Sequence, residues 1–348
     1  MAKMTVACLA VMAVFISCKK DDKDDNNGNN PGGNGNNDSF WDSKVDVYVV
    51  GHTYAPETGE ACLWKNGAKQ KLGEGYEALS VCVSDTNVYV AGNNIANGNV
   101  PYIWKNGIKQ ELNGGSGKYA KSIYVSGNDV YVAGYKFNGS VKERAILWEN
   151  GVQKILPAWD YDDDTPMNAY ANSVFVYNND VYVAGQSNIG GICIWKNGIK
   201  QALLSSGTDM VSYANSIFVY NGDVYVAGYI WGEQGYEIDQ AYLWKNGERV
   251  LLGDNSSANS VFVYNDNVYV TGYSNGQACL WKNGVKEILK DGNVGNSVFV
   301  YNGDVYVTGT GYESGRNKAI LWKNGTPKVL EEGANINASA NSVFVKVK

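Results

Sequence analysis

The stretch "ANSIFVYNGDVYVAG" (residues 214–228) consists of two short runs of β-branched and aromatic residues joined by Asn-Gly. Asn-Gly between two such runs is the strongest short-range signal for a β-hairpin with a two-residue turn. Apolar residues occupy both alternating sides of each run, as Phe218 and Val219 illustrate. A strand that is apolar on both faces is expected to lie between two neighbouring sheets. The stretch therefore predicts a hairpin that is covered on both sides.

The chain repeats this hairpin and couples it to a second one. The motif VYVxG, or a close variant, ends at Gly51, Gly92, Gly134, Gly185, Gly228, Gly272 and Gly309. The motif WKNG or WENG begins at Trp64, Trp104, Trp148, Trp195, Trp244, Trp281 and Trp322. The A-N-S-V-F-V-like run has its serine at Ser80, Ser122, Ser173, Ser216, Ser260, Ser297 and Ser342.

Each repeat thus supplies four antiparallel strands, which we call A (SVFVY), B (DVYVAG), C (AILW) and D (KxxL). Four strands in about 40 residues is the size of one β-propeller blade. No window has the 3.6-residue periodicity of a helix, so helical solenoids are excluded. A β-solenoid is the alternative, although its coils are shorter and lack intervening hairpins.

The two ends of the repeat region complement each other. The first repeat begins at "VDVYVVG" (residues 45–51), which is a strand B without a strand A. The final stretch "ANSVFVKVK" (residues 340–348) is a strand A without a strand B. Pairing the two closes a ring and removes the open edges of a linear array. We therefore expect an all-β, seven-bladed β-propeller over residues 45–348, closed by the C-terminal strand pairing into the first blade.

The order A-x-L-W-K-N-G, Leu, A-N-S and N-G-D-V-Y-V-A-G resembles the extracellular HAF-type repeats and, more distantly, kelch repeats. The resemblance covers residues 45–348. It implies a propeller and brings no established chemistry. The Gly-Gly pair of kelch repeats and the GH…WD signature of WD repeats do not recur from repeat to repeat in this sequence.

Residues 1–17 have the pattern of a secretory signal peptide. One lysine precedes an apolar run from Met4 to Ile16, which is too short to span a bilayer. Ser17 followed by Cys18 resembles a bacterial lipobox, which implies cleavage before Cys18 and lipidation of this residue. An uncleaved anchor or a signal without lipidation is the alternative.

Residues 18–44 are expected to form a flexible tether behind the lipidated cysteine. The stretch "KKDDKDDNNGNNPGGNGNNDS" (residues 19–39) has no apolar side chain suited to a core. Its acidic run beside Cys18 resembles the surface-export signal of Bacteroidota lipoproteins, and a solvated spacer is the alternative. We expect the protein at the outer membrane, exposed on the cell surface and held by its lipid anchor alone.

Composition narrows the function classes. The net charge of −6 argues against nucleic-acid binding, which needs a basic footprint. The single histidine, His52, argues against histidine-based catalysis and against a histidine-rich metal site. Four cysteines are expected to be small core residues, because other repeats have apolar residues at their positions. They are Cys62, Cys82, Cys193 and Cys279.

The expected site lies at one end of the blades. The A–B and C–D turns are short, whereas the B–C and D–A connections, on what we call the top face, vary in length. Variable loops on a rigid scaffold are the usual place for a binding site. Aromatic residues outside the repeat motifs gather there. The candidate ligand-binding residues are Trp159, Tyr161, Tyr170, Tyr213, Tyr229, Trp231, Tyr236, Tyr135, Tyr273, Tyr312 and His52.

A second candidate set is the residue after each strand-B glycine, which differs between blades. These residues are His52, Asn93, Tyr135, Gln186, Tyr229, Tyr273 and Thr310. For both sets a structural alternative stays open. The loops then form a lid on the ring, and the second position simply starts a loop.

The acidic loop around Asp160 is expected to be a solvated loop, with Ca²⁺ binding by its oxygen ligands as the alternative. Its carboxylates are Asp160, Asp162, Asp163 and Asp164. We expect no other cofactor.

Aromatic faces with nearby amides and carboxylates suit the apolar face and the hydroxyls of a sugar ring. The favoured function is therefore a surface-tethered, non-catalytic carbohydrate-binding module that acts as a monomer. Because tyrosine and tryptophan patches also bind proteins, a protein–protein scaffold of a cell-envelope complex is the alternative. A carbohydrate-active hydrolase or lyase is the third and least favoured candidate. Glycosidases need two carboxylates close together, and nothing in the sequence pairs two carboxylates.

Overall fold

The computed structural model describes residues 40–54, 59–96, 98–113, 115–137, 143–158, 168–187, 191–203, 211–231, 239–333 and 336–348. Residues Phe40–Lys348 form one compact unit. The signal peptide, Cys18, Trp159, Tyr161, Tyr236 and the four loop aspartates lie outside the described residues. Within the described part of the chain, no helix is long and apolar enough to cross a bilayer.

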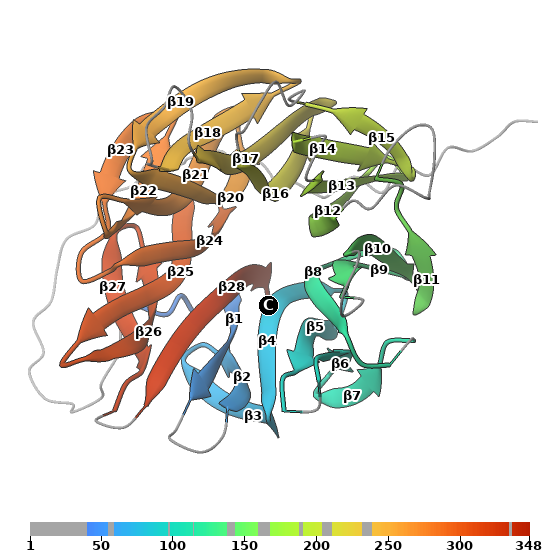
Figure 1. Cartoon of the computed structure of the whole chain (residues 1–348). Helices are drawn as coiled ribbons and strands as arrows, with labels where there is room; N and C mark the ends of the chain where they lie inside the picture. The colour runs from blue at the N-terminus through green and yellow to red at the C-terminus, as the bar shows by residue number, and fades with distance from the viewer. Residues whose placement is uncertain are drawn as a thin grey trace, which may run out of the picture. The chain divides into compact units, whose positions relative to one another are not determined.

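The unit is a ring of seven four-stranded antiparallel sheets, the blades, which confirms the predicted β-propeller (Figure 1). Blade 1 consists of β28 (Asn337–Val347), β1 (Val45–Tyr54), β2 (Gly59–Lys65) and β3 (Ala68–Glu74). Blade 2 consists of β4 (Tyr76–Ser84), β5 (Asn87–Asn94), β6 (Val100–Lys105) and β7 (Ile108–Glu111). Blade 3 consists of β8 (Lys118–Ser126), β9 (Asp129–Lys136), β10 (Arg144–Glu149) and β11 (Val152–Ile155).

The other four blades follow in chain order. Blade 4 consists of β12 (Ala169–Tyr177), β13 (Asp180–Ser187), β14 (Gly191–Lys196) and β15 (Ile199–Ala202). Blade 5 consists of β16 (Val211–Tyr220), β17 (Asp223–Trp231), β18 (Asp239–Lys245) and β19 (Glu248–Asp254). Blade 6 consists of β20 (Ser256–Tyr264), β21 (Asn267–Ser274), β22 (Gln277–Lys282) and β23 (Val285–Ile288). Blade 7 consists of β24 (Val294–Tyr301), β25 (Asp304–Glu313), β26 (Arg316–Lys323) and β27 (Thr326–Glu331).

The last strand closes the ring, as the sequence predicted. β28 pairs antiparallel with β1 from Val45 opposite Val347 to Tyr54 opposite Asn337. Figure 1 shows the red β28 beside the blue β1, with the first strand of every blade facing the centre of the ring. Blade 1 is therefore built from both ends of the propeller region.

Asn-Gly turns set the register of each C–D hairpin. Asn66 and Gly67 both have positive φ, 49° and 80°, which a two-residue type I′ turn requires. The Asn66 Oδ1 accepts the backbone N–H of Val47, and its Nδ2 donates to Asp46 at 2.8 Å. The same clamp of turn onto strand B recurs at Asn106, Asn150, Asn197, Asn246, Asn283 and Asn324.

A β-bulge explains the repeated glycine of strand B. In blade 4, Ala171 pairs with Gly185 and Ser173 with Ala184, so Asn172 is an extra residue in strand A. A Cβ on Gly185 would lie 1.8 Å from the carbonyl oxygen of Tyr170. The equivalent glycine of every blade meets a carbonyl oxygen at 1.8 to 1.9 Å. The bulge and the glycine are therefore one device, repeated seven times.

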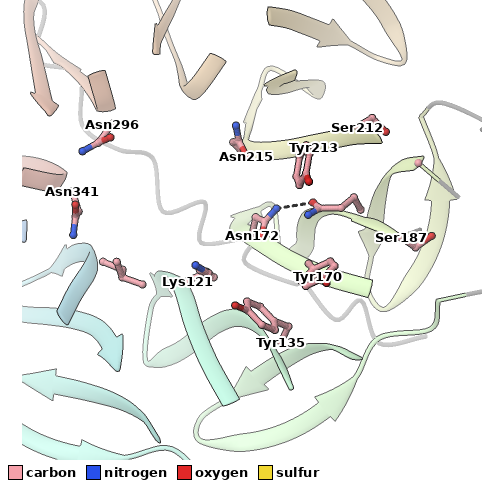
Figure 2. Close-up of a pocket in the computed structure, with 13 residues that line it drawn as sticks. Lys121, Tyr135, Tyr170, Asn172, Ser187, Ser212, Tyr213, Asn215, Asn296 and Asn341 are labelled. Atoms are coloured by element: carbon pink, nitrogen blue, oxygen red, sulfur yellow. Dashed lines mark hydrogen bonds between the residues drawn. The ribbon is translucent and has the colours of Figure 1, made fainter. Parts of the chain in front are cut away.

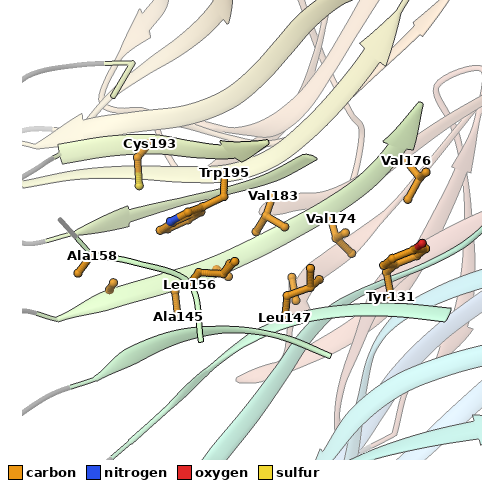
Figure 3. Packing of buried hydrophobic residues seen from close by; sticks show 13 residues of the cluster. Tyr131, Ala145, Leu147, Leu156, Ala158, Val174, Val176, Val183, Cys193 and Trp195 are labelled. Carbon is orange, nitrogen blue, oxygen red and sulfur yellow. The ribbon is translucent and has the colours of Figure 1, made fainter. Parts of the chain in front are cut away.

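The repeated tryptophans pack blade against blade. All seven are at most 1% exposed. The indole N–H of Trp195 donates to the Pro157 carbonyl of the preceding blade at 2.8 Å, and Leu156 packs in the same cluster (Figure 3). The four repeat-region cysteines are buried with free thiols, and Cys193 belongs to the Trp195 cluster. The core role predicted for these cysteines is confirmed.

Candidate functional site

A cavity of about 810 Å³ opens on the top face at the centre of the ring. Its wall is formed by the starts of strands A and the ends of strands B. Four predicted site residues line it, namely Tyr135, Tyr170 and Tyr213 (Figure 2) and, from the second set, Gln186. We call it the central cavity. The bulged residues Leu79, Lys121, Asn172, Asn215, Asn296 and Asn341 also line it.

The bulged asparagines join neighbouring blades and fix the wall of the central cavity. Asn172 donates to the Ala214 carbonyl at 2.8 Å, and Asn215 to the Ala258 carbonyl at 3.0 Å. Asn259, Asn296 and Asn341 make the same bond to the next blade. These side chains are therefore held in place before any ligand arrives.

Blades 2 and 3 lack the bulged asparagine. In blade 2 the position is Leu79, and Asn93 of strand B bonds to the next blade instead. The Asn93 Nδ2 donates to the Ala120 carbonyl at 3.1 Å, and its Oδ1 accepts the Ala120 N–H at 2.8 Å. In blade 3 the position is Lys121. Asn93 thus has a structural role, whereas Lys121 departs from the repeated pattern of asparagines at the bulge.

The tyrosines near the central cavity lie on blades 3 to 5 and contact one another. Tyr119 and Tyr135 are register partners with stacked rings whose centroids lie 4.6 Å apart. Tyr170 meets Tyr135 edge-on at 5.1 Å. Tyr213 and Tyr229 form a second stacked pair at 4.6 Å.

The expectation that these tyrosines lie in loops was wrong. Tyr135, Tyr170, Tyr213, Tyr229 and Tyr273 are all strand residues. The ladder between strands A and B continues past the bulge, so these residues are held across from partners on the opposite strand. Their rings are therefore attached to rigid backbone.

Burial keeps the hydroxyl groups of these tyrosines protonated. Burial, with smaller contributions from Tyr119, Glu143 and Glu77, raises the pKa of Tyr135 to about 12. Burial also raises the pKa values of Tyr229 and Tyr273. These side chains therefore present protonated hydroxyls, which both donate and accept hydrogen bonds.

A smaller depression of about 370 Å³ is lined by Tyr213, Tyr229, Trp231 and Asp239. Trp231 is 42% exposed at the end of β17. The Tyr273 hydroxyl donates to the Asp239 carboxylate. Because Tyr213 lines both hollows, the depression extends the tyrosine-rich side of the central cavity.

Three predicted site residues lie elsewhere. His52, in β1, has its Nδ1 3.1 Å from the Asn341 Nδ2, and burial lowers its pKa. Tyr312, in β25, is 61% exposed and lines a separate groove between blades 6 and 7. Thr310, from the second set, pairs with Val294 in blade 7. None of the three is among the described residues that line the central cavity.

The place of the middle residue of A-N-S on the cavity wall was not predicted from the sequence. The signal available was the departure from the repeat, Leu79 and Lys121 standing where five blades have asparagine. Among the described residues, no three His, Cys, Asp or Glu side chains gather closely enough to hold a metal ion.

Comparisons with known proteins support the fold. No family model and no curated protein matches the chain. A solved β-propeller domain of the trilobed protease from Pyrococcus furiosus, described as having an open velcro topology, is similar at 13% identity. It has a TM-score of 0.50, and the match covers 84% of this chain and 94% of that one.

Two further solved structures are similar at lower scores. A chain of a nidogen/laminin complex matches at 9% identity and TM-score 0.41, covering 86% of this chain and 98% of that one. The β-propeller domain of Cps50 (Swd1) from Myceliophteria thermophila matches at 11% identity and TM-score 0.45, covering 78% and 96%. At these identities the likeness concerns the fold alone, and the HAF-type and kelch resemblance stays a prediction.

Proposed function

We propose that the protein is a non-catalytic binding module that takes a carbohydrate in the central cavity. The observation that carries the proposal is the convergence of Tyr135, Tyr170 and Tyr213, from three adjacent blades, on one cavity with Gln186. Tyrosine rings offer faces for the C–H side of a sugar, and amides exchange directional hydrogen bonds with its hydroxyls.

The dimensions of the central cavity fit this use. Small-molecule sites have volumes of about 300 to 1,000 Å³, and the cavity has about 810 Å³. The bulged asparagines are already hydrogen-bonded across the blades, as Asn172 is to Ala214. A wall that is ordered before binding lowers the entropy lost when the ligand arrives.

We further propose that lipidated Cys18 and the acidic tether hold this module at the outer surface of the outer membrane. The support is the sequence pattern of residues 1–44. A ring presented at the end of such a tether reaches extracellular glycans without a membrane-spanning segment.

The alternative function is a protein–protein scaffold of a cell-envelope complex. The observation that favours it is the exposure of large apolar side chains near the top face and outside the central cavity. Phe137 is 49% exposed, Trp231 42% and Tyr312 61%. Exposed aromatic residues of this kind are typical anchors at protein interfaces.

A glycan array probed with residues 20–348 tests the proposal. Binding that is lost in a Tyr135→Ala, Tyr170→Ala double variant supports it. Tyr264→Ala is the matched control, because Tyr264 ends β20 at the opposite end of its blade. Absence of glycan binding, together with recovery of an envelope protein by pull-down, supports the scaffold instead.

A further inference from the structure

We infer that the central cavity selects an anionic saccharide and that Lys121 receives its anionic group. The inference rests on the proposed carbohydrate function and adds the class of sugar. A saccharide with a carboxylate or sulfate group has the required chemistry, because a lysine ammonium acts as a point charge and accepts either anion.

The first observation is the position of Lys121 in the repeat. It is the bulged residue of blade 3, between Ala120 and Ser122. Five other blades have asparagine at this position, each bonded to the next blade, for example Asn172 to Ala214. Blade 2 lacks it too, but Asn93 replaces the bond. Blade 3 therefore has a cation where most blades have a structural amide.

The second observation is the charge of the cavity wall. Among the described residues that line the central cavity, Lys121 is the single charged side chain. Its Nζ lies 5.7 Å from the centroid of the Tyr135 ring. Within the described residues no carboxylate forms an ion pair with it. By contrast, Lys65, Lys196 and Lys245, at the opposite end of their blades, each pair with an aspartate.

The chain as a whole is acidic, with a net charge of −6. Two acidic residues, Glu77 and Glu143, are close enough to influence the Tyr135 hydroxyl. Neither lines the central cavity, and the Glu77 carboxylate accepts a hydrogen bond from Asn93 at 2.9 Å. The wall that a ligand would touch is thus positive inside an acidic protein, an arrangement that steers anions.

The third observation is a neutral donor on the same wall. Gln186 is 8% exposed and lines the central cavity. Its Oε1 accepts a hydrogen bond from Asn172 at 2.7 Å. No described residue accepts a hydrogen bond from its Nε2, so this N–H group can donate to a ligand. Lys121 and Gln186 together offer a charge and a donor beside the faces of Tyr135 and Tyr170.

The test uses the full chain in detergent micelles and isothermal titration calorimetry. The probes are a galacturonate trimer, a sulfated galactose trimer and the neutral galactose trimer of equal length. The variants are Lys121→Gln, which removes the charge, Lys121→Arg, which keeps it, and Lys121→Asn, which restores the residue of the other blades. Lys105→Gln is the matched control, since the Lys105 Nζ lies 5.3 Å from the Tyr89 ring at the opposite end of its blade.

We expect an anionic trimer to bind the unmodified chain about tenfold or more tightly than the neutral trimer, a difference of about 1.4 kcal/mol. Lys121→Gln and Lys121→Asn should abolish this preference, so that the anionic and neutral trimers bind with similar affinity. Lys121→Arg and Lys105→Gln should keep the preference, and added salt should weaken it. Whether uronate or sulfate binds identifies the anionic group.

Equal affinity for the neutral and anionic trimers would overturn the inference and leave the carbohydrate function standing. A preference that persists in Lys121→Gln would overturn the role of Lys121. Absence of binding by all three trimers, alongside a negative glycan array, would overturn both proposals. Binding of the neutral trimer and thermal melting are measured on every variant, so a misfolded variant is recognised. If Lys121→Gln is misfolded, the affinities of Lys121→Asn for the anionic and neutral trimers decide the role of Lys121.

Discussion

The hydroxyl oxygen of Ser342, in the last strand, accepts a hydrogen bond from the backbone N–H of Val81 in blade 2 at 3.3 Å. Every blade makes this bond to the next one through the serine of its A-N-S run or its equivalent, at distances between 3.1 and 3.4 Å. The seven serines thus form a continuous belt around the ring. The belt is complete because β28 contributes the strand A of blade 1.

Removal of β28 should therefore unfold the ring. A chain ending at Glu332 loses the strand that pairs with β1 and leaves the inner face of blade 1 open. Loss of buried Val343 and Val345 costs about 2 kcal/mol each, and each lost backbone hydrogen bond costs about 1 kcal/mol. This sum approaches the total stability of an ordinary domain, about 5 to 15 kcal/mol. We expect no soluble, cooperatively melting protein.

The control for this truncation is a chain ending at Lys346, which keeps the pair of Val47 and Val345. It should melt cooperatively near the temperature of the intact chain. A chain ending at Glu332 with an unchanged melting curve would contradict the closure.

Gly185→Ala should destabilise the protein strongly. The added Cβ would lie 1.8 Å from the Tyr170 carbonyl oxygen, so the bulge opposite must move. We expect a loss of about 3 kcal/mol or more in urea unfolding. Gly253→Ala is the control, because its Cβ would have only the Ser256 side chain as a near neighbour, at 3.2 Å. Equal effects of the two variants would rule out the bulge as the reason for the glycine.

Trp231→Ala should weaken a ligand that reaches the depression beside the central cavity and leave folding intact. Trp231 is 42% exposed, so we expect a stability change below about 1 kcal/mol. Trp159→Ala carries the same sequence-based expectation. Trp195→Ala is the comparison, since full burial predicts a loss of about 3 to 5 kcal/mol. A melting temperature that falls as far in Trp231→Ala as in Trp195→Ala would make Trp231 a core residue.

The stability of the protein should decrease as the pH falls below about 6.5, the ordinary pKa of histidine. Burial lowers the pKa of His52, with Glu77 acting in the opposite direction. The unfolded chain therefore binds the proton at a higher pH than the folded one, which favours unfolding as the pH falls toward the folded pKa. His52→Gln should flatten the slope in urea titrations at pH 7.5, 6.5 and 5.5.

The Asp46 carboxylate does not contribute in this window, because its pKa is lowered and its contribution is lost only at still lower pH. An unchanged slope in His52→Gln would assign the pH dependence to other groups.

Cys18→Ala should release the protein from the membrane. The lipid on Cys18 is the proposed anchor, so the variant should appear in the soluble fraction and fail to incorporate labelled palmitate. Cys62→Ala, at a buried position, is the control for cysteine loss and should keep the label. Membrane retention of Cys18→Ala would contradict the anchor.

Local patterns in the sequence were sufficient for the architecture. Asn-Gly turns such as Asn66-Gly67 set hairpin register within a few residues, and the seven repeats specified the number of blades. Phe218 and Val219, on opposite faces of one strand, already indicated a sheet covered on both sides. The unpaired final strand indicated the closure. These signals are local or periodic, so they can be read without knowing which residues meet across the ring.

The site depended on contacts that no local pattern contains. Tyr135, Tyr170 and Tyr213 were named from the sequence, but only the ring brings their three blades to one cavity and places His52 and Tyr312 elsewhere. The proposed role of Lys121 depends on the bulge, which places the extra residue of strand A on the wall of the central cavity in six of the seven blades. By itself the sequence determined the fold, because hairpins and repeats are local. The tertiary structure decided which side chains share the cavity, because that depends on the curvature that closes seven blades into a ring.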